Sequence, residues 1–479
     1  MELNLVRQSA AAVSADAVIV FEAEGGKSLA GVLPVQYESG EISGKFAEYT
    51  LVHNVAGFAS PRVLVAGSGK PEALDSTKLR KLISGALRTL KSKGIKSVAV
   101  AVHAAADVEA AAEAGVVALW EPDLLKTTGK EPEKAIGRVL IAVESTDPAV
   151  DAAFEKGRVI GTALNTTRDI AVEPPNVLTP LALVARARAV AAAAGLEIDV
   201  LDQDRMKQLG MGALLGVAQG SAEPPALIII RYNPASGPTQ DNLGLVGKAV
   251  TFDTGGIPIK PADGMEKMKY DMCGGAAVLG AMQAIAALKP GVSVTGVIPA
   301  AENMPGSKAQ RPGDIVTSLA GKTIEILNTD AEGRLILADA ITYAKQLGCT
   351  HLVDAATLTG AIVVALGHAA SGVYTNNDDF LDTFLAASKQ AGEQMWHMPL
   401  FDEYLEQLKC VYADIQNIGT RWGGACTAAM FLKEFVGDTP WVHIDCAGTA
   451  WLDDAKPHMA KGPTGVPLST FVHLALNWK

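Results

Sequence analysis

A short stretch in the second half of the chain concentrates side chains that can bind metal ions or move protons. The sequence at 328–335 is Asn-Thr-Asp-Ala-Glu-Gly-Arg-Leu, so Asp330, Glu332 and Arg334 occupy every second position. The mostly apolar run that follows predicts a helix. Ionised groups are costly to bury alone, and buried ones are usually paired or bound to metal. The stretch therefore indicates a charged site at the start of a helix.

A second stretch, 247–272, places charged side chains among small and apolar residues. Two of its lysines and two of its acids are candidates for chemistry: Lys248, Asp253, Lys260 and Asp271. Oxygen-rich clusters suit hard or borderline divalent cations, and two such cations can share bridging carboxylates. Together the two stretches predict a two-metal hydrolase.

Each of these acids, taken alone, is more typical of a helix cap or a surface salt bridge. Their surroundings favour a common site. Asp253 precedes the glycine pair 255–256, where another backbone segment can approach closely. Asp271 precedes a predicted helix with two glycines in its first turn.

Other catalytic motifs are incomplete. The pair Gly247-Lys248 resembles the end of a phosphate-binding loop, but Asn242 and Ala249 replace the required glycine and hydroxyl residue. One Asp-Thr-Gly occurs, at 253–255, whereas an aspartic protease needs two opposed copies. The sequence contains neither His-Glu-x-x-His nor Gly-x-Ser-x-Gly, which argues against those zinc and serine hydrolases.

Composition limits the class of protein. The chain has 479 residues, enough for two or three domains, and 49% of them are hydrophobic. Aromatic residues make up only 5%, which favours tightly packed α/β layers over a β-sandwich. The net charge of −11 gives no global attraction for nucleic acid or an anionic membrane.

Cysteine usage and the absence of targeting signals indicate a cytoplasmic location. The five cysteines are scattered without a Cys-x-x-Cys pair, as expected for reduced thiols. The N-terminus lacks a basic-then-apolar signal, and no apolar run approaches the roughly 20 residues of a membrane helix. We therefore expect no membrane partner.

Residues 1–150 are predicted to form an N-terminal α/β domain. Apolar runs of strand length occur at 17–21, 62–66, 97–102 and 138–143. An amphipathic helix after Asp75 or Ser76 has a basic outer face. That face is either a solvated surface or a site for an anionic partner such as DNA; the first interpretation is favoured.

A connecting helix and a proline-rich link are predicted at 151–175, and a larger domain at 176–479. The helix breaks near Pro174-Pro175, because a residue before proline is displaced from helical geometry. Further strands are predicted at 196–200, 226–230, 243–246, 294–298, 351–354 and 441–445, and further helices at 181–194, 273–288, 333–347 and 425–435. Sites in such sheets lie at the carboxyl ends of strands, where Lys248, Asp253 and Asp354 are expected.

Several of these stretches resemble the leucine (cytosol) aminopeptidase family, of the bacterial aminopeptidase A type. Asn-Thr-Asp-Ala-Glu-Gly-Arg-Leu at 328–335 matches the family signature, and 246–272 resembles it closely, as do 209–217, 302–305 and 311–314. The similarity covers most of 170–479. It implies an α/β fold of two domains, each a mixed sheet flanked by helices: a smaller, macro-like N-terminal domain and a larger di-metal peptidase domain.

The resemblance also implies a ligand set for two divalent ions, Mn²⁺ or Zn²⁺. Asp253 and Glu332 would bridge the ions, Asp330 would complete one site, and Lys248 with Asp271 would complete the other. A lysine ligand must be neutral, although free lysine has a pKa of about 10.4. Only an adjacent dication in a desolvated site makes that possible.

For catalysis, the resemblance assigns Lys260 to polarise the scissile carbonyl and Arg334 to hold a bicarbonate that deprotonates water. The substrate's free α-amino group would bind the second metal, which restricts the enzyme to exopeptidase activity. The substrate-binding residues would be Met268, Asn328, Thr357 and Leu358, with Met268 as a wall of the pocket for leucine.

The family further implies a homohexamer acting on peptides with a free N-terminus. Two alternatives remain open from the residues. One is an additional DNA-binding or transcriptional role of the N-terminal domain, which the net charge does not favour. The other is a catalytically inactive relative kept as a scaffold, against which the intact ligand set argues.

Overall fold

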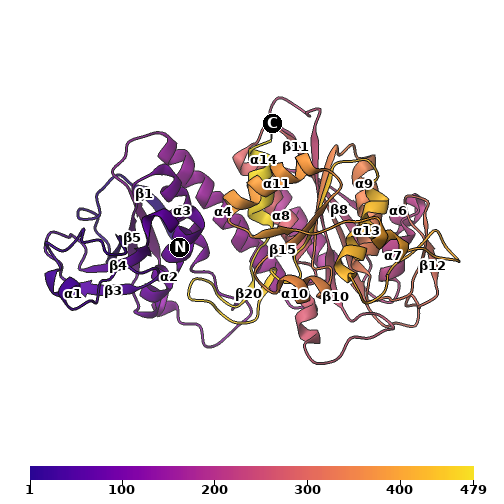
Figure 1. Ribbon diagram of the computed structural model, residues 1–479, viewed down its shortest axis with the longest axis horizontal. Coiled ribbons are helices and arrows are strands. Elements are labelled where there is room, and N and C mark those ends of the chain that lie inside the picture. Colours follow the sequence, from indigo (N-terminus) through magenta and orange to yellow (C-terminus); the bar gives the residue numbers. More distant parts are fainter. Residues whose placement is uncertain (479) are drawn as a thin grey trace. The chain divides into compact units, whose positions relative to one another are not determined.

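The computed structural model describes residues 1–478 and divides the chain into two α/β units. The first comprises residues 1–165 and 453–462, and the second comprises 166–452 and 463–479. Each unit contains its own mixed sheet with flanking helices, which confirms the predicted fold class. In Figure 1 residues 1–165 of the first unit run from indigo to purple and its segment 453–462 is yellow, while the second unit runs from purple through magenta and orange to yellow.

The first unit is built on a six-stranded sheet. Its strands, in spatial order, are β1 (Glu2–Val6), β6 (Arg138–Ala142), β5 (Ser97–Ala101), β2 (Ala17–Ala23), β4 (Arg62–Gly69) and β3 (Tyr49–His53). All neighbours are parallel except β3 and β4. Its helices are α1 (Pro34–Glu38), η1 (Pro71–Ala73), α2 (Ser76–Ser92), α3 (Ala105–Val117) and η2 (Pro132–Lys134). The sequence analysis missed β1, β3 and α3.

Both faces of this sheet are buried, as the apolar strand runs predict. Successive side chains of a strand point to opposite faces. Ile19 packs in one core with α2 and α3, whereas Val18 and Val20 pack in a second core. α2 itself begins where expected, because the Asp75 side chain accepts a hydrogen bond from Lys78 N at 2.8 Å.

Three of the six cations on the basic face of α2, Arg80, Arg88 and Lys91, pair with neighbouring acids. Arg80 pairs with Glu113 of α3 at 3.3 Å, and both side chains are nearly buried. Arg88 and Lys91 both contact Glu121, at 3.2 and 2.6 Å. These cations therefore hold the unit together instead of forming an open cationic surface.

The second unit is built on a nine-stranded sheet. Along its main path the strands are β16 (Met395–His397), β15 (Ser371–Thr375), β18 (Trp441–Asp445), β14 (His351–Ala356), β9 (Asn242–Gly247), β11 (Ser293–Asn303), β8 (Ala226–Tyr232) and β7 (Glu197–Leu201), while β10 (Ala249–Asp253) pairs with β11 beyond β9. A small sheet contains β12 (Ile315–Thr317), β13 (Thr323–Glu325) and β17 (Ile415–Gln416). Two short strands are β19 (Trp451–Leu452) and β20 (Gly462–Pro463).

Helices surround this sheet and connect its strands. They are α5 (Pro180–Ala194), α6 (Gln203–Leu209), α7 (Gly212–Ala218), η3 (Met265–Tyr270), α8 (Cys273–Leu288), α9 (Gly333–Gln346), α10 (Gly360–Leu366), α11 (Asp378–Ala391), α12 (Glu403–Glu406), α13 (Gly424–Val436) and α14 (Leu468–Leu476). The helix α4 (Ala149–Val172) begins in the first unit and ends in the second. α4 runs through most of the predicted connecting segment and ends before Pro174.

One helical run, Met265–Leu288, is long and apolar enough to cross a membrane by length and composition. Within the described residues, 78% of its apolar window is buried inside the protein. The run includes α8, whose residues 273–282 are all buried. It is thus placed as a core helix of the second unit.

Two strand predictions need correction. Asp253 lies at the carboxyl end of a strand as expected, but not just after the predicted strand at 243–246: it ends a separate strand, β10, and pairs with Asn303 of β11. Asp354 was expected at a strand end facing a site. β14 continues to Ala356, and Asp354 is fully buried inside the sheet.

Candidate metal centre

The candidate site lies where β9, β10 and β14 end, and the backbone of Lys248 is fixed there between β14 and α8. Lys248 N donates to Ala355 O at 3.0 Å, and Lys248 O accepts from Gly275 N at 2.7 Å. These bonds direct a long side chain into a space from which water is nearly excluded, since Lys248 is only 2% exposed.

Asp253 is held by donors on both sides. Its Oδ1 accepts from Gly255 N at 2.9 Å and from Asn303 Nδ2 at 2.8 Å. Gly256 then adopts a positive φ of 76°, and a Cβ there would lie 2.5 Å from Thr329 Oγ1. This close approach, which requires glycine, brings the segment after β10 against the loop that carries the other acids.

That loop, residues 327–332, is called the acid loop below. It leads directly into α9, so Arg334 lies in the first turn of the helix. Thr329 Oγ1 donates to Gly255 O at 2.7 Å, and Asp330 N donates to Asn328 Oδ1 at 3.0 Å. The chain bends so closely that a Cβ on Gly333 would lie 2.7 Å from Lys248 Cε.

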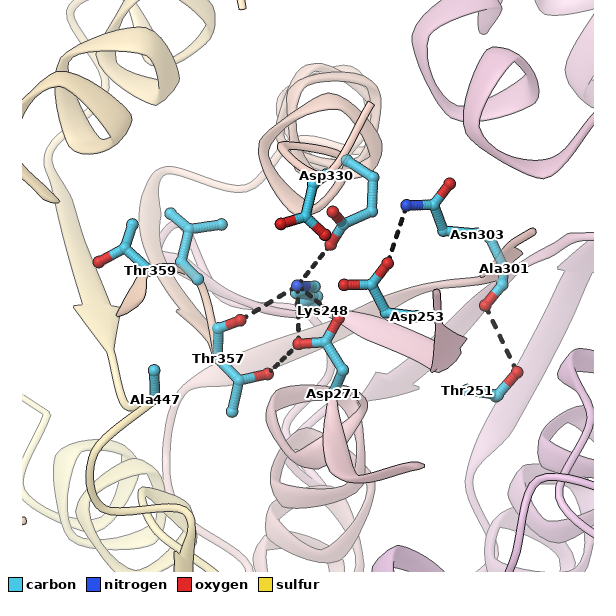
Figure 2. A network of polar contacts seen from close by, with 12 residues as sticks. Lys248, Thr251, Asp253, Asp271, Ala301, Asn303, Asp330, Thr357, Thr359 and Ala447 are labelled. Carbon is cyan, nitrogen blue, oxygen red and sulfur yellow. Dashed lines mark hydrogen bonds and ion pairs between the residues drawn. The ribbon is translucent and has the colours of Figure 1, made fainter. Parts of the chain in front are cut away.

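The side chains converge as the sequence analysis required (Figure 2). Lys248 Nζ lies 2.7 Å from Asp271 Oδ2 and 2.7 Å from Glu332 Oε1. Lys260 Nζ lies 2.8 Å from Asp253 Oδ2 and 2.5 Å from Asp330 Oδ1. Two ammonium groups thus lie among four carboxylates, which come from the end of β10, the turn between η3 and α8, and the acid loop.

This crowding shifts the pKa of both lysines and of three of the acids, Asp271, Asp330 and Glu332. Burial disfavours the charged Lys248, but Asp271, Glu332 and Asp253 outweigh that effect and raise its pKa. The pKa of Lys260 is raised in the same way by the acids around it. Burial, and then the charge of Asp253, raises the pKa of Glu332 to about 8. Burial also raises the pKa of Asp271 to about 6. The acids repel one another and need more positive charge nearby.

Arg334 is a buried cation beside the acids. Burial lowers its pKa to about 10, although Glu332 and Asp445 act in the opposite direction. Its NH1 donates to Asn417 O at 2.8 Å, whereas its Nε has no hydrogen-bond partner among residues 1–478. A buried donor without a partner indicates a place for an anion or a polar ligand.

The donor set fits divalent cations. One oxygen each from Asp253, Asp330 and Glu332 lie within 4.8 Å of one another. Within the described chain, Glu332 Oε2 is buried and accepts no hydrogen bond. Carboxylate oxygens at this density are typical ligands of hard or borderline cations, and a cation would satisfy the unbonded oxygen.

All the residues predicted for the site line one cleft of about 490 Å³. They include the four expected to bind substrate: Met268, Asn328, Thr357 and Leu358. Thr357 Oγ1 also donates to Asp271 Oδ1 at 2.7 Å. The segment after β14 is fixed by Asp445, which accepts from Leu358 N at 3.1 Å.

Several residues of the site were not predicted. His368, Ile418, Gly424 and Ala447 also line the cleft. Asn303 fell in a stretch that resembles the family but was given no role, and Asn417 was not considered at all. A single asparagine forms no sequence motif. Asn417 contacts acid-loop residues that are 89 and 90 positions away in the chain, so no local pattern could reveal its role.

Two models of one protein family match this chain. The model of the cytosol aminopeptidase family's catalytic domain matches residues 165–472, and the model of its N-terminal domain matches residues 14–129. The chain therefore belongs to the cytosol aminopeptidase family. Its activity is accordingly that of an aminopeptidase, a peptide hydrolase.

Individual relatives agree over the whole length. The chain is 54% identical to the probable cytosol aminopeptidase of Solibacter usitatus (strain Ellin6076), covering 100% of both chains. It is 46% identical to that of Koribacter versatilis (strain Ellin345), covering 99% of each.

Solved structures with the same fold include two enzymes. A mutant of tomato leucine aminopeptidase has a TM-score of 0.90 at 32% identity, covering 99% of this chain and 96% of that one. The bottromycin maturation enzyme BotP, in complex with Mn, has a TM-score of 0.87 at 32% identity, covering 96% and 99%.

Proposed function

We propose that this aminopeptidase binds two divalent ions, Mn²⁺ or Zn²⁺, and releases N-terminal amino acids from peptides, preferably leucine. The ligands would be Lys248, Asp253, Asp271, Asp330 and Glu332. The observation that carries the proposal is the convergence of four carboxylates on two ammonium groups in one cleft, with a buried Glu332 oxygen that no group of residues 1–478 satisfies. The Mn complex of BotP supports divalent ions.

Bound divalent ions supply a water of lowered pKa and polarise the carbonyl that it attacks. Lys248 can act as a ligand only as a neutral amine. Its raised pKa comes from three carboxylates, and the effect reverses once those carboxylates bind cations instead.

Lys260 acts on the substrate carbonyl. It is half-buried at the cleft, and its ammonium group can donate to the oxyanion that forms when water attacks. Asp271 would support the free α-amino group of the substrate. An internal peptide bond has no free amine to offer, so only the N-terminal residue is released.

Arg334 would hold a bicarbonate that accepts a proton from the attacking water. The unpartnered Nε of this buried guanidinium supports an anion at that position, and the backbone near Leu358 lies in the same cleft. Met268 would form a wall of the side-chain pocket, with Asn328 and Thr357 beside it. The likeness to a tomato leucine aminopeptidase supports the preference for leucine.

The test is release of leucine from a chromogenic leucyl amide with and without Mn²⁺ or Zn²⁺. Lys260→Ala should lower kcat by about 10²- to 10³-fold, the usual effect of losing one oxyanion donor. Arg334→Ala should lower kcat and remove its dependence on added bicarbonate. Metal-independent hydrolysis that survives both substitutions would overturn the proposal.

We also propose that the protein is a homohexamer, that it is located in the cytoplasm, and that its catalytic domain spans residues 176–479. The description of relatives as cytosol aminopeptidases supports the location. The DNA-binding role remains the less favoured alternative, because Arg80, Arg88 and Lys91 are paired with acids.

A further inference from the structure

The acid loop carries much of the proposed chemistry but has little regular structure of its own. Residues 327–332 form neither helix nor strand, yet Asp330 and Glu332 must face the cleft. A metal site tolerates little displacement of its ligands, and groups behind the ligands usually fix their orientation. Two buried asparagines contact this loop, one at its beginning and one at its middle.

Asn417 holds the beginning of the acid loop. It is 0% exposed and follows β17. Its Oδ1 accepts from Leu327 N at 2.9 Å and from Asn328 N at 3.4 Å, and its Nδ2 donates to Asn328 O at 2.7 Å. Its own carbonyl accepts from Arg334 NH1 at 2.8 Å. One residue thus bonds both to the loop and to the arginine that follows it.

Asn303 holds the middle of the acid loop. It is 3% exposed and is the last residue of β11. Its Nδ2 donates to Asp253 Oδ1 at 2.8 Å and to Thr329 O at 3.0 Å (Figure 2 shows the first of these). The amide therefore bridges one proposed bridging ligand to the backbone directly before Asp330.

We propose that Asn303 and Asn417 are positioning residues for the metal centre. Between them they set the separation of Asp253 from the acid loop and the direction of Arg334. This inference rests on the proposed two-metal function. Neither side chain needs to contact a metal or substrate for this role.

Both positions require a carboxamide, because each side chain must donate hydrogen bonds through its Nδ2 and also have the size of asparagine. Asn303 Nδ2 faces a carboxylate and a carbonyl, which are both acceptors. Asn417 presents an oxygen to two N–H groups and a nitrogen to a carbonyl, so its orientation is fixed by its partners. Aspartate has the same shape but cannot donate when ionised, and it would repel these acceptors.

The chain offers a matched control in Asn376. Its Oδ1 accepts from Trp441 N at 2.9 Å, and its Nδ2 donates to Gly437 O and Thr439 O at 3.1 and 2.9 Å. It thus makes the same number of side-chain hydrogen bonds to backbone as Asn417. It lies at the opposite end of β18 from Asp445, away from the cleft.

The experiment compares Asn303→Asp, Asn417→Asp and Asn376→Asp in the full chain. Isothermal titration calorimetry measures the Mn²⁺ affinity, and hydrolysis of a leucyl amide gives kcat and KM. Thermal unfolding without added metal gives Tm. We expect the first two variants to lose about 10- to 100-fold in Mn²⁺ affinity or kcat, the usual effect of removing such supporting bonds. KM should change less for Asn303→Asp than for Asn417→Asp, because only Asn417 also bonds to Asn328, a proposed substrate-binding residue. Asn376→Asp should lower Tm only.

If an aspartate variant does not fold, Asn303→Ala and Asn417→Ala replace it, since they remove the donor without adding charge. Asn303 and Asn417 variants that match Asn376→Asp in Mn²⁺ affinity and kcat, while the wild-type enzyme is active, would overturn this inference alone. Failure of the wild-type protein to bind Mn²⁺ and hydrolyse the amide would instead overturn the proposed function, and this inference with it.

Discussion

Two polar clusters of opposite character lie along the line of β14 and β18, one inside the sheet and one beyond the strand ends. Inside the sheet, Asp354 accepts from Trp441 Nε1 at 2.6 Å and contacts His443 Nδ1 at 2.6 Å. Asp354 and His443 are direct neighbours in the strand register, and Trp441 lies on the same face two residues earlier. All three side chains are fully buried.

A few residues further along, the strands end at the cleft, where the acids are not satisfied in this way. Each Asp354 oxygen has a well-placed partner, whereas Glu332 Oε2 has none within the described residues. The interior acid binds one imidazole and one indole, while four cleft acids share two ammonium groups. The difference separates an acid that stabilises the fold from acids arranged for a ligand.

The largest expected effect is on activity, from Glu332→Gln. The variant keeps the shape but removes a proposed bridging ligand, so hydrolysis should fall by about 10³-fold and Mn²⁺ binding should weaken. Tm without added metal should not fall, because Lys248 remains paired with Asp271 and one of the mutually repelling carboxylates is gone. A marked loss of Tm would show that the cleft acids serve folding as the interior acid does.

How far the sequence could predict the cleft depended on where its ligands lie along the chain. Asp330, Glu332 and Arg334 are close together in sequence, and so are Lys248 and Asp253, so local patterns and a family resemblance found them. Asn417 was missed because its role exists only once β13 and β17 are paired. No local pattern marks a pairing between such distant segments.

The fold was predicted best where burial is uniform. Continuous apolar runs revealed β2, β4, β5 and β6, but not the half-exposed edge strands β1 and β3. Asp354 was misplaced because a charged residue usually ends a buried strand. Here Trp441 and His443 satisfy it inside the sheet, which the sequence of β14 alone does not show.

A third buried acid, Asp339 of α9, tests whether neutral hydrogen-bond donors alone can keep a buried carboxylate ionised. It accepts from Leu214 N and Leu319 N at 2.9 and 2.7 Å, yet burial raises its pKa from 3.8 to about 7. Below about pH 4 both folded and unfolded states are protonated. As the pH rises to 7 only the unfolded state ionises, so stability is lost, by up to about 4 kcal/mol at about 1.4 kcal/mol per pKa unit.

The Asp339→Asn variant isolates this contribution. Its free energy of unfolding, measured by denaturant titration from pH 4 to pH 8, should decline less between pH 4 and 7 than that of the wild-type protein, and the remaining decline comes from other buried acids such as Asp271 and Glu332. Parallel curves for the two proteins would mean that Asp339 is ionised throughout and that its two backbone donors suffice.

For the interior cluster, Asp354→Asn should reduce stability and leave catalysis of the folded protein unchanged. The amide can still accept one hydrogen bond but leaves the other buried donor without a partner, a loss of about 2–3 kcal/mol. Denaturant titration measures the stability, and kcat with saturating Mn²⁺ measures the catalysis. A fall in kcat with unchanged stability would remove the contrast between this cluster and the cleft.

The smallest effect is expected from an ion pair on the surface of α4, Arg158 with Glu155, whose nitrogen and oxygen lie 2.6 Å apart. The contact is as short as those in the cleft, but the side chains are 43% and 52% exposed, so water screens the charges. Glu155→Gln should change the free energy of unfolding by less than about 0.5 kcal/mol. A loss close to that of Asp354→Asn would show that pairing itself, and not burial, decides the energy of such contacts in this protein.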